Sequence, residues 1–64
     1  MMSTIKPHPE KVNQALLDRA IATRKPRNAL FSEYIRVHYI ATGDIAPGCD
    51  AKDFYAALDA KVKP

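Results

Sequence analysis

The residues best suited to bind an anion lie at positions 24–28, in the run Arg-Lys-Pro-Arg-Asn. Three cationic side chains flank Pro26, and a stretch rich in apolar residues follows directly. If that stretch is a helix, its first turn carries N–H groups without helical partners and the positive end of the helix dipole. Cations beside such N–H groups attract a phosphate in two ways, so the sequence predicts a phosphate-binding site here.

No comparable motif points to catalysis or to a metal. Cys49 is the only cysteine, which excludes an intramolecular disulfide, and no cation adjacent in sequence would activate its thiol. His8 and His38 have no cysteine at zinc-ligand spacing, and we interpret His38 as a core side chain bonded to backbone or to a cross-dimer partner. We therefore predict no enzymatic activity, no cofactor, no metal and no small-molecule substrate.

The charge of the chain is unevenly distributed. The net charge is +3, and residues 1–41 hold seven Lys and Arg against three Asp and Glu, whereas residues 42–64 hold three against four. A basic N-terminal two thirds suits a nucleic-acid surface, although an ordinary basic surface is the alternative. The sequence contains neither a signal-peptide pattern nor the ~18 apolar residues of a membrane span. We expect a cytoplasmic protein without a membrane partner.

The apolar periodicity and the helix-end signals predict one mainly α domain over residues 1–64. Its elements are a short strand over 3–7 and helices over 9–24, 28–42 and 50–62.

Individual residues set the expected helix ends. Asn28 is the expected N-cap of the second helix, and Gly43 supplies a helix-ending position with positive φ. Asp50 is the expected N-cap of the third helix, with Asp53 at capping-box-like spacing. We expect Asp53 and Asp59 to face water.

The second helix carries more apolar surface than one small core requires. Its apolar residues lie on several sides: Leu30, Phe31, Tyr34, Ile35, Val37 and Ile40. A chain of this length buries only about 60% of its unfolded surface and is marginal alone. We therefore predict a homodimer whose core is built mainly from both copies of this helix.

The order of short strand, helix, basic turn and helix resembles the ribbon-helix-helix family of bacterial transcriptional repressors. Residues 3–6 (Ser-Thr-Ile-Lys) correspond to its strand, 8–12 (His-Pro-Glu-Lys-Val) to the entry into its first helix, and 28–34 to the start of its second. The resemblance covers about residues 3–42. Pro7, the longer link between the helices and the third helix depart from the family. The whole chain also resembles small plasmid-encoded proteins of plant-pathogenic bacteria, which implies the same family.

The resemblance implies a homodimer whose N-terminal strands pair into an antiparallel ribbon that enters the major groove of double-stranded DNA. The N-terminus of the second helix would then anchor on phosphate. Because strand side chains alternate, Thr4 and Lys6 would face the bases together. The expected phosphate contacts are Arg24, Lys25, Arg27 and Asn28. The predicted function is a sequence-specific DNA-binding repressor, and the alternative is a small helical protein–protein interaction module without DNA binding.

Overall fold

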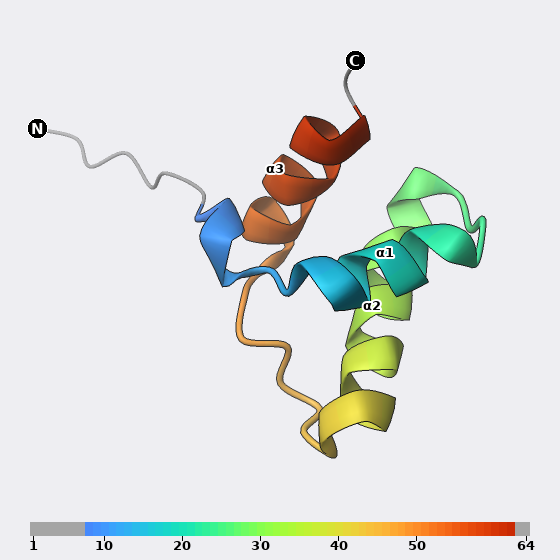
Figure 1. Cartoon of the computed structure of the whole chain (residues 1–64), viewed down its shortest axis with the longest axis vertical. Helices are drawn as coiled ribbons and strands as arrows, with labels where there is room; N and C mark the ends of the chain where they lie inside the picture. The colour runs from blue at the N-terminus through green and yellow to red at the C-terminus, as the bar shows by residue number, and fades with distance from the viewer. Residues whose placement is uncertain (1–7, 63–64) are drawn as a thin grey trace, which may run out of the picture.

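The computed structural model describes residues 8–62, which fold into three helices around one small core (Figure 1). The helices are α1 (Gln14–Ala22), α2 (Arg27–Thr42) and α3 (Ala51–Val62), and a short 3-10 turn, η1 (Pro9–Lys11), precedes α1. α1 packs across α2, and η1 lies beside α3. The predicted mainly α fold is confirmed for this part of the chain, while the strand predicted over 3–7 lies outside the described residues.

The core lies where the three helices meet. Tyr34 of α2 and Phe54 of α3 are fully buried, with ring centroids 5.1 Å apart. The Tyr34 hydroxyl oxygen accepts the backbone N–H of Asn13 at 3.0 Å, which fixes the start of α1 against α2. Burial raises the pKa of Tyr34, and this N–H opposes the shift. The core side chains are Val12, Leu16, Leu17, Ala20, Leu30, Tyr34, Phe54, Ala57 and Leu58.

The first helix is shorter than the helix predicted over 9–24. Val12 is extended, with φ −90° and ψ 125°, and separates η1 from α1. Asn13 then caps α1, because its side-chain oxygen accepts the N–H groups of Ala15 (3.0 Å) and Leu16 (3.2 Å). An asparagine that bonds N–H groups in this way favours a helix start over a helix interior. The break also turns Val12 into the core.

The start of α2 corrects a second prediction, because Pro26 and not Asn28 is its N-cap. Pro26 has φ −63° and ψ 156°, and its carbonyl accepts the N–H of Ala29 at 2.8 Å. Its ring fixes φ, and the extended ψ gives the geometry of an N-cap residue. Asn28 is the second residue of the helix. At the other end the prediction is confirmed, since Gly43 ends α2 with φ 79°.

Asp53 is buried, which contradicts the prediction that it faces water. Only 6% of its surface is exposed, and its carboxylate accepts the backbone N–H of His8. This hydrogen bond is the main cause that lowers the pKa of Asp53. The predicted N-cap of α3 is confirmed, because the Asp50 side chain accepts the Asp53 N–H at 2.9 Å. Asp53 therefore joins the start of α3 to the segment that leads into η1.

A single chain already covers much of the apolar surface of α2. Leu30 and Tyr34 are buried, and Phe31 and Val37 pack against the core, whereas Ile40 is exposed. The homodimer stays a prediction. Less apolar surface of α2 remains exposed for a core shared between two copies than the sequence suggested. No helix within residues 8–62 combines the length and the apolar character needed to cross a membrane.

Candidate nucleic-acid interface

A tight turn joins α1 to α2 and carries the cations singled out in the sequence. The hydroxyl of Thr23 donates to the carbonyl of Ala20 at 2.6 Å, and the N–H of Arg24 donates to the carbonyl of Ile21 at 3.0 Å. These bonds satisfy carbonyls at the end of α1, which lack helical partners. Arg24 has φ 61°, the left-handed conformation that usually ends a helix at glycine. An arginine is strained there, because its Cβ approaches the following carbonyl oxygen.

Arg24 and Lys25 are both exposed in this turn. Within residues 8–62, no carboxylate lies within ion-pairing distance of either side chain. Their charges are therefore not neutralised by a partner in the described part of the chain. A ligand with negative charge can approach both.

The first turn of α2 follows directly. No described side chain caps this helix end, and both Arg27 and Asn28 are exposed. A shallow depression beside it is lined by Arg27, Asn28 and Tyr55. The N–H groups of a helix start without a capping side chain are suited to bind an anion. We call this helix start, with Arg24 and Lys25, the basic corner.

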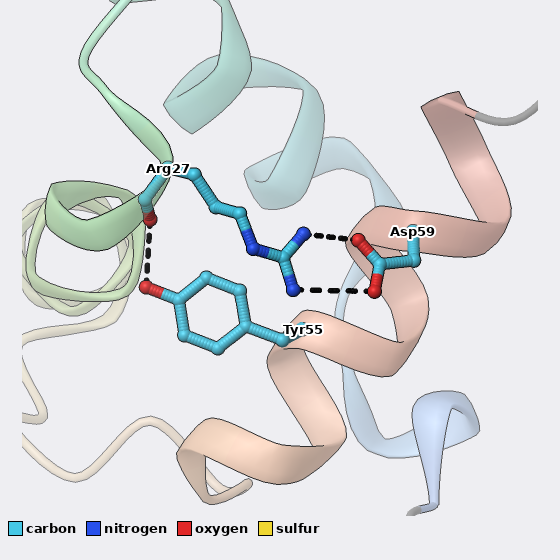
Figure 2. A network of polar contacts seen from close by, with 3 residues as sticks. All are labelled: Arg27, Tyr55 and Asp59. Carbon is cyan, nitrogen blue, oxygen red and sulfur yellow. Dashed lines mark hydrogen bonds and ion pairs between the residues drawn. The ribbon is translucent and has the colours of Figure 1, made fainter.

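Arg27 makes a different set of contacts from its neighbours (Figure 2). Its guanidinium forms a two-pronged ion pair with Asp59 of α3, in which Nη2 and Oδ2 are 3.2 Å apart and Nη1 bonds Oδ1. The guanidinium carbon lies 4.8 Å from the centroid of the Tyr55 ring. The Tyr55 hydroxyl donates to the backbone carbonyl of Arg27 at 2.7 Å. The hydrogen bond to Asp59 is the main cause that raises the pKa of Arg27.

The network of Arg27, Tyr55 and Asp59 was missed in the sequence, where we expected Asp59 to face water. The available signal was the spacing of Tyr55 and Asp59, which stand four residues apart and so share a face of one helix. An aromatic ring and a carboxylate on one face suit an arginine. The sequence alone did not reveal which arginine lies opposite.

The structure thus gathers four of the six predicted DNA contacts at one corner: Arg24, Lys25, Arg27 and Asn28. Arg24 and Lys25 have no carboxylate partner among residues 8–62, Asn28 lies in the exposed first turn, and Arg27 is bonded to Asp59. The two predicted base contacts, Thr4 and Lys6, lie outside the described residues.

Between residues 8 and 62, no group of three or more His, Cys, Asp or Glu side chains is placed to hold a metal ion. Cys49 is half-buried, and burial is the main cause that raises the pKa of its thiol, with Asp53 and Asp50 adding to the shift. A raised pKa favours the neutral thiol, which is a poor nucleophile.

Comparison with known proteins adds no assignment of family or function. No family model, no curated protein and no solved structure matches this chain. The functional argument therefore depends on the residues of the chain itself, and above all on the basic corner.

Proposed function

We propose that this chain binds double-stranded DNA as a homodimer and acts in the cytoplasm as a sequence-specific transcriptional repressor. The observation that carries the proposal is the basic corner, where the start of α2, which no described side chain caps, adjoins two exposed cations that lack a carboxylate partner among residues 8–62. Helix N–H groups and cationic side chains are the groups that most often contact DNA phosphates. The excess of basic residues in the first two thirds of the chain supports the same ligand.

The proposed binding mode is that of a ribbon-helix-helix homodimer. The succession of α1, basic turn and α2 agrees with the order of helices in that family. Residues 3–7 of two copies would form the ribbon, with Thr4 and Lys6 on base edges, and the two basic corners would hold phosphates on either side. A two-fold symmetric dimer reads a site with matching symmetry, so the operator should be an inverted repeat.

Salt titration of DNA binding tests this proposal. Fluorescence anisotropy with a labelled duplex of random sequence measures the affinity of the wild-type chain at increasing salt. Each phosphate contact contributes about −0.9 to the slope of log affinity against log salt. We expect a clear negative slope, and a tighter complex with duplexes enriched by selection from a random pool. Absence of duplex binding at low salt would refute the proposal.

A helical protein–protein interaction module is the second candidate. It is favoured by the exposed apolar side chains at the C-terminal end of α2 and in the loop that follows: Tyr39 (53% exposed), Ile40 (67%) and Ile45 (73%). Large exposed apolar surfaces mark protein–protein interaction sites, and these three residues are the candidates to form one. A chain that self-associates in sedimentation equilibrium but never binds duplex DNA would support this module instead.

A further inference from the structure

Asp59 of α3 forms an ion pair with Arg27, one of the cations that we predicted to contact phosphate. We propose that Asp59 competes within the chain for the guanidinium of Arg27, so that α3 restrains DNA binding at the start of α2. This inference depends on the proposed DNA binding. It gives α3, which has no counterpart in the ribbon-helix-helix resemblance, a regulatory role.

The geometry of the ion pair matches that of a phosphate contact. Arg27 presents both terminal nitrogens to the two oxygens of Asp59. A guanidinium binds carboxylate and phosphate with the same fork of donors, so it cannot serve both fully at once. In Figure 2 the Arg27 side chain extends along the Tyr55 ring to Asp59. Its charge is thus directed to α3 in the absence of DNA.

The ion pair is also accessible enough for Arg27 to exchange Asp59 for a phosphate. The side chains of Arg27 and Asp59 are 57% and 43% exposed, so solvent screens their attraction and a ligand can reach both. Arg24 and Lys25 have no such partner among residues 8–62, so within the basic corner the competition falls on Arg27. The wild-type chain must break this surface ion pair before Arg27 can contact phosphate. That cost should weaken its affinity for DNA by about two- to fivefold.

Contacts other than those of Asp59 also hold α3 in place. Phe54, Ala57 and Leu58 hold the helix in the core, and the Tyr55 hydroxyl bonds the Arg27 carbonyl independently of the ion pair. Replacing the carboxylate by a neutral amide of the same shape should therefore release the guanidinium and leave the fold intact.

The test compares Asp59→Asn with Asp18→Asn. Asp18 lies on α1 and pairs with Lys61 at 2.8 Å, so its replacement changes the net charge equally without touching Arg27. Binding of each variant to one random-sequence duplex is measured by anisotropy over a range of salt. We expect Asp59→Asn to bind about two- to fivefold more tightly, with a slope steeper by about one contact, and Asp18→Asn to keep the wild-type slope. The gain should vanish in the double variant Arg27→Gln/Asp59→Asn.

Several outcomes separate the two proposals. Salt-dependent binding by the wild type, with equal slopes for Asp59→Asn and Asp18→Asn, would overturn the competition and leave DNA binding intact. Failure of both the wild type and Asp59→Asn to bind would overturn DNA binding and the competition with it. Circular dichroism checks that each variant is folded. Asp59→Ser, which also removes the carboxylate, must reproduce the gain, and a wild-type slope for this variant would overturn the competition.

Discussion

Replacing Arg24 by glycine should stabilise the fold while weakening DNA binding. Arg24 alone among the described non-glycine residues has a positive φ, 61°. The left-handed conformation costs a residue with a Cβ about 1–2 kcal/mol. Glycine relieves this strain. It also lowers the stability of the fold by about 0.5–1 kcal/mol, because a glycine loses more conformational freedom on folding than other residues do. The free energy of unfolding should therefore rise by about 0.5–1 kcal/mol.

Thermal unfolding followed by circular dichroism measures this change. A domain of this size shifts its melting temperature by about 4–8 °C per kcal/mol, so we expect a rise of roughly 2–8 °C. Lys25→Gly is the matched control, because it removes a neighbouring cation at a position without positive φ and should lower the melting temperature. A lower melting temperature for Arg24→Gly would refute the strain argument. Duplex DNA binding should weaken in both variants, since each loses a cation of the basic corner.

Three further changes test the fold and the site. Tyr34→Phe removes the acceptor of the Asn13 N–H and should lower the free energy of unfolding by about 0.5–1.5 kcal/mol. Urea denaturation measures this change, and an unchanged value would show that the hydrogen bond does not stabilise the start of α1. The pKa of Asp53 is lowered from 3.8 in the folded chain, so its stabilising effect is complete above about pH 5 and is lost as the pH falls through the folded pKa. Melting temperatures against pH should therefore fall less steeply in acid for Asp53→Asn than for the wild type. Lys6→Ala should cost roughly 1–3 kcal/mol of binding on a selected duplex and much less on random DNA, and equal losses on both would assign Lys6 to phosphate.

Most of the helices could be predicted from sequence because their signals are local. The N-cap of α3 at Asp50 and the end of α2 at Gly43 each depend on residues within one helical turn. The signal for the start of α1 is also local, because Asn13 caps it, but the apolar periodicity on both sides of Asn13 favours one longer helix over 9–24. The start of α2 was missed for a similar reason, because proline can serve as an N-cap through backbone geometry alone.

The remaining features depend on contacts between distant parts of the chain. The carboxylate of Asp53 is buried because the N–H of His8 reaches it from 45 residues away. Asp59 meets Arg27 across a separation of 32 residues, so their pairing requires knowing how α3 packs on α2. Periodicity places a side chain on a face of its own helix, but it does not identify the residue that lies opposite. The candidate site was thus predictable as a cluster of cations, and the ion pair of Arg27 with Asp59 was not.

The most direct test of the proposed DNA binding is the salt slope of the double variant Arg24→Ala/Lys25→Ala. Both side chains are exposed and lack a carboxylate partner within residues 8–62, so their loss should remove about two phosphate contacts and flatten the slope accordingly. Lys52→Ala, which removes an exposed cation near the start of α3, is the control and should keep a slope close to that of the wild type. A double variant that binds duplex DNA with the wild-type affinity and slope would contradict the role of the basic corner.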